Sequence, residues 1–518
     1  MTQMNWQAVY PEVFLLAMAC FVAMVDLWVK HPRRTPTYLL TQLSLALVAV
    51  MHLASFLSTV SAYDAIVSRM PEAGGHLPAL TDPTLTFYAM QGMVVADPMG
   101  HLLVFFATAA TMISLVYARP YAAERDMLKG ELFTLSMFSL LGISVMASAN
   151  NFLVVYLGLE LMTLSLYALT AMRRDHADAT EAAMKYFVLG ALASGFLLYG
   201  LSMMYGATGS LEMSEVFKAI GTGQINKPVL ILGVVFVVSG LAFKLGAVPF
   251  HMWVPDVYQG APTVVTLLIG GAPKLAAFAI TIRLLVEGML GLAVDWQQML
   301  IVLSVGSMLL GNLAAIAQRN LKRMLAYSSI AQMGFVLLGL CSGVVNGNTL
   351  SAGNAYSSSM FYMVTYVLTT LGTFGMIMLL SRQGFEAEEI DDLKGLARRS
   401  PWFAVVMTIF MLSLAGLPPT AGFYAKLSVL QALVSTNSAG LIWLAVAAVL
   451  LSLVGAFYYL RVIKVMFFDE PTDTNPIVST ADVRAVLSLN GAAVLIFGLL
   501  PSGLMVWCAK AIVIALAN

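Results

Sequence analysis

Long apolar segments follow one another along the whole chain, and they constrain the fold more than any other feature. Each run holds about 20 residues, enough for a helix to cross a hydrocarbon layer of about 30 Å. Because the bilayer core offers no water to unpaired backbone groups, only helices and closed barrels cross it. Barrel strands would give short segments of alternating hydrophobicity instead. The chain is 60% hydrophobic and only 10% charged, so the sequence predicts an all-α membrane protein without a large soluble domain.

The apolar runs predict about 14 transmembrane helices. Lys and Arg gather in alternate loops, such as 30–34, 119–129 and 319–323. Since cytoplasmic loops of membrane proteins are enriched in these residues, we expect both termini on the outer side. The predicted spans are 11–29, 38–60, 97–117, 131–149, 151–171, 185–206, 228–250, 263–286, 298–316, 322–342, 356–381, 401–434, 439–467 and 485–514.

Proline interrupts the apolar interior of spans seven and twelve, and Pro273 beside Gly271 weakens the helix of span eight. Span seven contains Pro249, and span twelve contains Pro418 and Pro419. Proline lacks a backbone donor and clashes with the preceding turn, so we expect helices seven and twelve to be broken. Broken helices at matching places in two halves of a chain are typical of transporters. Because the two spans are five apart, the pattern predicts two five-helix repeats of opposite orientation.

This spacing divides the chain into four parts. We expect an N-terminal three-helix segment at 1–130 and the first five-helix repeat at 131–290. The second, inverted repeat would follow at 291–470, and a C-terminal helix at 471–518.

Four ionisable residues lie deep inside apolar segments, namely Glu160, Lys244, Lys274 and Lys426. A charge at the bilayer centre costs on the order of 3 kcal/mol even on the mildest scale. Residues of this kind face the protein interior, pair with one another and mark ion or proton pathways. The sequence therefore predicts an ion-translocating protein, and above all a proton translocator that uses these four side chains.

Each of these charges also has a structural interpretation. The long stem of Lys244 could carry its ammonium group to the interface, and Lys426 would lie near water if its segment were re-entrant. A buried carboxyl such as Glu160 needs a partner or a proton. Lys244 is a suitable partner if spans five and seven pack together, and Lys185 at the start of span six is another. Lys185 is therefore a further proton-transfer candidate, although an anchor at the membrane edge is the simpler interpretation.

Weaker candidate residues occur at two places: directly after the break in span seven, and in the loop after span eleven. His251 and Asp256 could line a proton uptake route, or they could have a structural role at a helix end; we count His251 among the candidates. The acidic stretch 386–392 is most simply a solvated loop, with docking of another subunit as the alternative. Arg283 in span eight has no role that the sequence indicates.

The sequence offers no cofactor site. Cys20, Cys341 and Cys508 are scattered without a CxxC pair, so we expect neither an iron–sulfur nor a zinc site. Neither a GxGxxG motif after a strand nor a Walker A motif occurs. Any redox cofactor or nucleotide would therefore belong to other subunits. The net charge of zero argues against a nucleic-acid partner.

Several motifs resemble those of the antiporter-like membrane subunits of respiratory complex I, most closely subunit N, over essentially the whole chain. The PFHMWVPDVYxGAP stretch is highly specific for this superfamily. The matching features are Glu160, Lys185 after it, FKLGAVPFHMWVPDVYQGAPT around Lys244, GGAPKLAAF around Lys274, KRMLAYSSIAQMG from Lys322 and LPPTAGFYAKL before Lys426.

The resemblance implies a proton channel built from two inverted five-helix repeats. Glu160 and Lys244 resemble the paired channel residues of the first repeat. Lys274 resembles the central connecting lysine, and Lys426 resembles the terminal residue of the second repeat. Lysine at this last position, and the lack of a long lateral helix, favour subunit N over its relatives.

The implied reaction is the oxidation of NADH by quinone, coupled to proton pumping. This chain would carry protons only, while NADH, FMN, iron–sulfur clusters and quinone would belong to partner subunits. We expect subunits K and M as its neighbours in the complex, and the lipid bilayer of a bacterial inner (plasma) membrane as its location. The alternatives are a subunit of a multi-subunit cation/proton antiporter, a subunit of a hydrogenase-type membrane complex, and a structural spacer.

Overall fold

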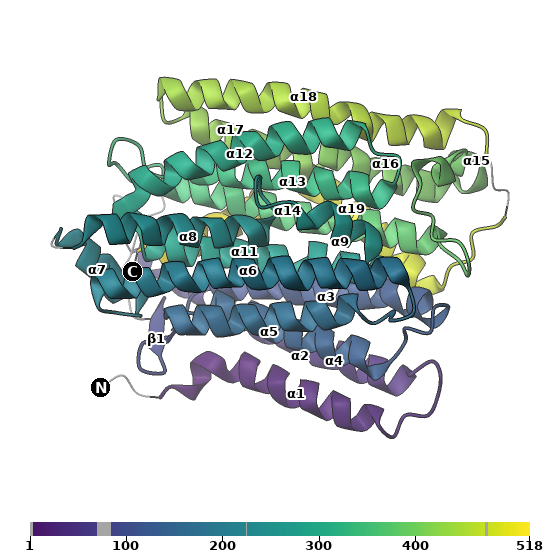
Figure 1. Cartoon of the computed structure of the whole chain (residues 1–518), viewed down its shortest axis with the longest axis horizontal. Helices are drawn as coiled ribbons and strands as arrows, with labels where there is room; N and C mark the ends of the chain where they lie inside the picture. The colour runs from purple at the N-terminus through teal and green to yellow at the C-terminus, as the bar shows by residue number, and fades with distance from the viewer. Residues whose placement is uncertain (1–3, 70–83, 224, 472–474, 518) are drawn as a thin grey trace.

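The computed structural model describes residues 4–69, 84–223, 225–471 and 475–517. The helices run side by side along one direction (Figure 1). Within the described residues, 13 helical stretches are long and apolar enough to cross a membrane. They are α1 (Tyr10–Asp26, extended by η1, Trp6–Val9), α2 (Thr35–Val67), α3 (Pro98–Ala123), α4 (Gly130–Ala147), α5 (Phe152–Thr170), α6 (Ala177–Thr208), α8 (Lys227–Leu245), α10 to η2 (Thr263–Glu287), α12 (Ala293–Ile316), α13 (Leu321–Leu340), α14 (Ala352–Leu380), α18 (Ala439–Phe468) and α19 (Ala481–Leu499).

Shorter elements complete the described fold. Three of them are apolar helices of 10 to 17 residues, α16 (Pro401–Ala415), α17 (Ala421–Val434) and α20 (Ser502–Leu516). The remaining elements are β1 (Phe87–Ala89), β2 (Val94–Ala96), α7 (Met213–Gly221), α9 (Trp253–Gly260), η3 (Leu290–Leu292), η4 (Ile390–Leu393) and α15 (Leu396–Arg399).

The expected breaks occur in spans seven and twelve. The helix of span seven ends at Leu245, and the chain resumes helical structure only in α9. Span twelve is divided into α16 and α17. The eighth span is divided as well, because α10 ends at Gly270 and α11 (Ala272–Thr281) begins two residues later. The last span is divided between α19 and α20 at Leu500 and Pro501.

The helices separate into a buried centre and an exposed periphery. Nearly all of α13, of α14 and of the stretch from α10 to η2 is buried inside the protein, whereas only a small part of α1 and α18 is buried. Small residues let the central helices approach closely. Gly372 of α14 lies against Phe410, and Gly375 lies against Tyr117, so an added Cβ would clash with either ring. The central helices are therefore the ones that can enclose charged side chains away from lipid.

The two ends of the bundle differ. A small antiparallel hairpin pairs β1 with β2, from Phe87 opposite Ala96 to Ala89 opposite Val94. This hairpin is a minor departure from the expected all-α fold. It lies with α7 and both chain termini at one end (Figure 1), whereas α15 lies at the other. The fold is that of an all-α membrane protein with about 13 candidate spans.

Candidate functional site

The first break is formed at the end of α8. Gly246 follows Leu245 with φ +77°, a conformation that favours glycine, so the helix stops there. Lys244 lies one residue before this end. Its ammonium nitrogen Nζ donates to Ser194 Oγ of α6 at 3.4 Å, and the side chain is only partly buried.

Glu160 lies on α5, on the same helical stripe as the exposed residues Leu157 and Leu164. One carboxylate oxygen, Oε1, is buried and has no hydrogen-bond partner among the described residues. The charge of Glu160 acts on Lys244. Within the described structure, however, the two side chains form no ion pair of 4.0 Å or less. They are neighbours whose charges are not in contact.

Lys274 contacts the C-terminal end of α8 at the same break. It belongs to the first turn of α11, and its side chain is only 1% exposed. Nζ donates to the Leu245 carbonyl at 2.6 Å and lies 5.7 Å from the centre of the Trp253 ring. A cation at the C-terminal end of a helix meets unpaired carbonyl groups and the negative end of the helix dipole.

Lys426 has the same relation to the second break. Helix α16 ends at Ala415, followed by Gly416 with φ +80°. Lys426 of α17 donates from Nζ to the Ala415 carbonyl at 2.9 Å, to the Leu414 carbonyl at 3.3 Å and to Ser452 Oγ at 2.8 Å. The two breaks therefore each place a buried lysine ammonium on the carbonyl end of a half-helix.

Gln332 is a polar residue near Lys426 that the sequence interpretation missed. Its Nε2 atom donates to the Leu414 carbonyl at 2.9 Å, the same oxygen that Lys426 contacts. Gln332 also bonds the hydroxyl groups of Tyr459, at 3.0 Å, and Tyr362. A glutamine within an otherwise apolar span was the only signal in the sequence.

Lys185 is not beside Glu160. It lies at the start of α6, 41% exposed, and pairs with Asp256 Oδ2 at 2.7 Å and Glu181 Oε1 at 2.8 Å. Asp256 in turn pairs with Arg323 at 2.8 Å. These residues line a cavity of about 250 Å³ at the end of the bundle away from the hairpin.

His251 lies in the turn between α8 and α9 and is partly buried. Its Nδ1 atom is buried and has no hydrogen-bond partner among the residues described. The turn thus holds a ring nitrogen that is free to accept or donate, near the break that Lys244 and Lys274 border.

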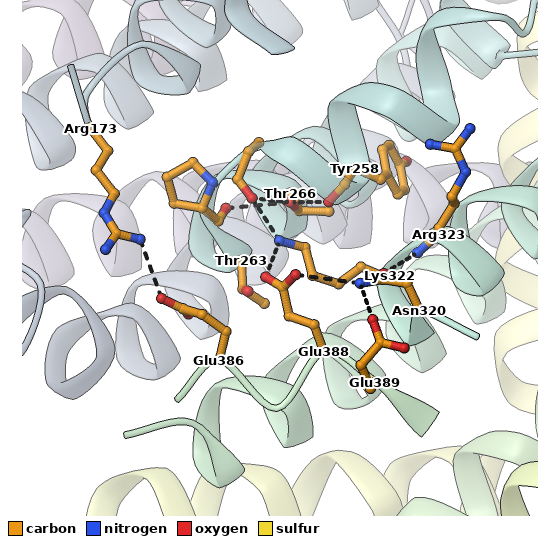
Figure 2. Close-up of polar contacts among 12 residues, drawn as sticks. Arg173, Tyr258, Thr263, Thr266, Asn320, Lys322, Arg323, Glu386, Glu388 and Glu389 are labelled. Carbon is orange, nitrogen blue, oxygen red and sulfur yellow. Dashed lines mark hydrogen bonds and ion pairs between the residues drawn. The ribbon is translucent and has the colours of Figure 1, made fainter. Parts of the chain in front are cut away.

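The acidic stretch 386–392 is not a freely solvated loop. Glu386 pairs with Arg125 at 3.0 Å and Arg173 at 3.3 Å, and accepts from Tyr121. Glu388 pairs with Lys322 at 2.9 Å (Figure 2). The simpler sequence interpretation was wrong, because the loop folds back over buried or partly buried cations that are distant in the sequence.

Arg283 has a structural partner set that the sequence did not reveal. Its side chain is 1% exposed, and Nη1 pairs with Asp97 at 2.6 Å and Glu287 at 2.7 Å. Its Nη2 atom donates to the Ala147 carbonyl at 2.9 Å. Arginine keeps its proton in proteins, so this cluster joins α3, α4 and η2 without releasing a proton.

No group of three or more His, Cys, Asp or Glu residues that could hold a metal ion occurs in the part of the chain that the structure describes.

The chain is similar over its whole length to proteins of known class. A family described as NADH:quinone oxidoreductase/Mrp antiporter, TM, matches residues 149–455. NADH-quinone oxidoreductase subunit N of Polaromonas naphthalenivorans is 62% identical over 98% of both chains. Subunit N of Herminiimonas arsenicoxydans is 59% identical over the full length of both.

Solved structures share the fold. A chain of respiratory complex I from Thermus thermophilus is 30% identical with a TM-score of 0.73, covering 96% of this chain and 98% of that one. An archaeal membrane-bound sulfane sulfur reductase has a TM-score of 0.80 at 24% identity, covering 99% and 100%. The Mrp complex from Dietzia has a TM-score of 0.78 at 21% identity, covering 99% and 97%.

Fold alone does not separate the classes that the sequence left open, because complexes of several kinds contain it. High identity over the full length does separate them, and it selects subunit N over the cation/proton antiporter and hydrogenase-type alternatives. The chain therefore belongs to the family of subunit N, the antiporter-like membrane subunit of the proton-translocating NADH-quinone oxidoreductase, bacterial complex I.

Proposed function

We propose that protons cross the membrane within this chain, along a path that uses Glu160, Lys185, Lys244, Lys274, Lys426 and His251. The observation that carries the proposal is the matching position of two buried lysines. Lys274 and Lys426 each contact the terminal carbonyl of a broken helix, at 2.6 Å and 2.9 Å. Lysine, unlike arginine, can exist with or without its extra proton. Two such groups in the buried centre are suited to receive and pass on protons.

The path would begin at the cavity beside Lys185. Lys185 and Asp256 border this water-accessible space, and His251 lies in the turn that leads from it towards the break. Lys244 would receive the proton there. Approach of the Glu160 carboxylate would hold the proton on Lys244, and withdrawal would release it towards Lys274 and then Lys426. The present separation of Glu160 from Lys244 is compatible with the released state.

The architecture that this path requires is two inverted five-helix repeats. We count 14 crossings if α16 and α17 form one broken crossing and α20 completes α19. The repeats would then occupy 131–290 and 291–470, with a three-helix segment at 1–130 before them and a C-terminal helix at 471–518. Both termini would lie on the outer side of the inner membrane, because the basic loops gather at the other end.

The redox chemistry would be carried out elsewhere in the complex. We assign NADH, FMN, the iron–sulfur clusters and quinone to partner subunits, and we expect subunits K and M as membrane neighbours. The exposed stripe of Leu153, Leu157 and Leu164 beside Glu160 is suited to lipid or to such a neighbour. A partner that moves against this stripe could shift the Glu160 carboxylate, which would couple its motion to Lys244.

Proton pumping in inverted membrane vesicles tests the proposal, with NADH as electron donor. We expect Lys244→Met and Glu160→Gln to lower the protons pumped per electron in a complex that assembles and oxidises NADH. Lys218→Met is the matched control, because Lys218 is an exposed lysine paired only with Glu215 within α7. Normal pumping per electron in Lys244→Met and Glu160→Gln, at normal electron flow, would remove both residues from the mechanism.

A further inference from the structure

Lys322 is a third buried lysine on the end of a helix. It is the second residue of α13, and its side chain is 1% exposed. Nζ donates to the Ala261 carbonyl at 2.7 Å and to Glu388 Oε1 at 2.9 Å. Ala261 follows the last residue of α9, in the short interruption before α10. Lys322 thus repeats the contact that Lys274 and Lys426 make, but at the end of the bundle where the basic loops gather.

Glu388 connects Lys322 to water. It is 24% exposed and lines the cavity of about 250 Å³ that also contains Asp178, Glu181, Lys185, Asp256 and Arg323. Figure 2 shows Lys322 between Glu388 and the interruption that Thr263 borders. The other charged groups nearby are Glu386, whose charge interacts with Lys322, and the Asp256–Arg323 pair.

The interior side of Lys322 is lined by buried hydroxyl groups. Tyr258 OH, Thr263 Oγ1 and Ser329 Oγ form no hydrogen bond of 3.5 Å or less among the described residues. Tyr258 and Ser329 lie near each other. The Tyr258 ring centre lies 6.4 Å from that of Trp253, and Lys274 Nζ lies 5.7 Å from the Trp253 ring. Unsatisfied buried hydroxyls are unusual and are suited to ordered water.

From this juxtaposition we propose that Glu388 and Lys322 form a proton-loading pair, which takes protons from the cavity and delivers them to the hydroxyl-lined interruption between α9 and α10. The proposal rests on the proposed proton path and adds its uptake side. In each cycle the Lys322 ammonium gives one proton to water or a hydroxyl in the interruption and becomes a neutral amine. Glu388 then takes one proton from the cavity and transfers it to that amine, which restores the ion pair.

The neighbouring ion pair on the same loop cannot act in this way. Glu386 pairs with Arg125 and Arg173, and guanidinium groups do not lose their proton in proteins. Glu386 and Glu388 therefore give a matched comparison. Both fasten the loop through ion pairs, but among the described residues Glu386 pairs with arginines, whereas Glu388 pairs with a lysine, which can release a proton.

The decisive substitution is Lys322→Arg, which keeps the positive charge and the donors but cannot deliver a proton. Variants would be made in the complete complex, and protons per electron would be measured in inverted vesicles with NADH. We expect Lys322→Arg and Glu388→Gln to lose as much pumping as Lys274→Met, with Glu386→Gln at the wild-type value. Glu388→Gln keeps the side-chain shape, so it remains informative if arginine does not fit at position 322.

The outcomes separate the two proposals. Wild-type pumping in Lys322→Arg, or in Glu388→Gln if only that variant assembles, would overturn the loading pair. Equal losses in Glu388→Gln and Glu386→Gln would also overturn it, since they would show a role in fastening the loop. A loss in Lys322→Arg with normal pumping in Lys274→Met would support the pair and overturn the central role of Lys274.

Discussion

Buried charges in this chain differ in whether they can release a proton. The three lysines at helix ends each contact a backbone carbonyl, and Lys322 also pairs with Glu388; their ammonium groups remain chemically able to gain and lose a proton. Arg283 instead contacts two carboxylates, Asp97 and Glu287, together with one carbonyl. The chemistry of the cation thus separates the lysines, which can release a proton, from the arginine, which keeps its proton and joins helices.

The structural role of Arg283 predicts a large loss of stability on removal. In Arg283→Leu the carboxylates of Asp97 and Glu287 would remain buried without a cation, which costs about 3–5 kcal/mol. We expect little assembled subunit in membranes, measured by the amount that purifies with the complex. Arg283→Leu combined with Asp97→Asn should recover part of the loss, whereas Lys218→Leu, at an exposed pair, should have little effect. A double variant no better than the single would contradict this explanation.

The broken helices determine where the lysines act. The breaks after α8 and α16 each begin with a glycine of positive φ, Gly246 and Gly416, and each supplies unpaired carbonyl groups within the core. At Gly416 an added Cβ would lie 2.5 Å from Cδ of Lys426 and 3.1 Å from its Nζ. The glycine therefore provides both the turn and the space for the lysine side chain.

Substitution of Gly416 separates these two roles. Alanine at positive φ costs roughly 1–2 kcal/mol, and at position 416 it would also displace Lys426 from the Ala415 carbonyl. We expect Gly416→Ala to lower the protons pumped per electron in the assembled complex. Gly209→Ala is the matched control, because Gly209 ends α6 with φ +77° and an added Cβ there meets nothing within 4 Å. Equal pumping in the two variants would show that the space beside Lys426 is unimportant.

At the scale of the whole molecule, the loop after α14 fastens one end of the bundle. Glu386 joins the end of α3 through Arg125 and Tyr121, and the loop between α5 and α6 through Arg173. Burial alone would raise the pKa of Glu386. The hydrogen bonds and charge of Arg125, with smaller effects of Tyr121 and Lys322, outweigh burial and hold the pKa below its ordinary value.

This lowered pKa predicts how stability depends on pH. A depressed folded-state pKa means that the contribution of Glu386 is fully present above its unfolded-state pKa and is lost as pH falls through the folded-state pKa. We expect Glu386→Gln to lower the apparent Tm of the purified complex at pH 7.5, by a contribution on the order of 1 kcal/mol. The difference from wild type should shrink as pH falls below about 4. Glu470→Gln, at an exposed pair with Arg398, serves as control; a difference independent of pH would contradict the assignment.

Much of this arrangement could be predicted from local sequence. Pro249, Pro418 and Pro419 predicted the two principal breaks, because proline inside a helix breaks or kinks it. The sequence indicated only a weakened helix at Pro273 and a tilt or break in the long last span, since a proline can also kink a helix that continues, as Pro120 does within α3. The proton-transfer roles of Glu160, Lys185, Lys244, Lys274, Lys426 and His251 remain predictions.

By itself, the sequence determined that this protein is a bundle of apolar helices with charges enclosed inside it. The thickness of the hydrocarbon layer sets the length of each span, and unpaired backbone groups or charges inside it cost free energy. These constraints apply to each segment separately, so their consequences can be predicted from local sequence. Only the tertiary structure decided the partners. Arg283 meets Asp97 across 186 positions, and Lys322 meets Glu388 across 66. Such pairs depend on which helices pack together, and that choice is made by the shape of the whole core rather than by any one segment.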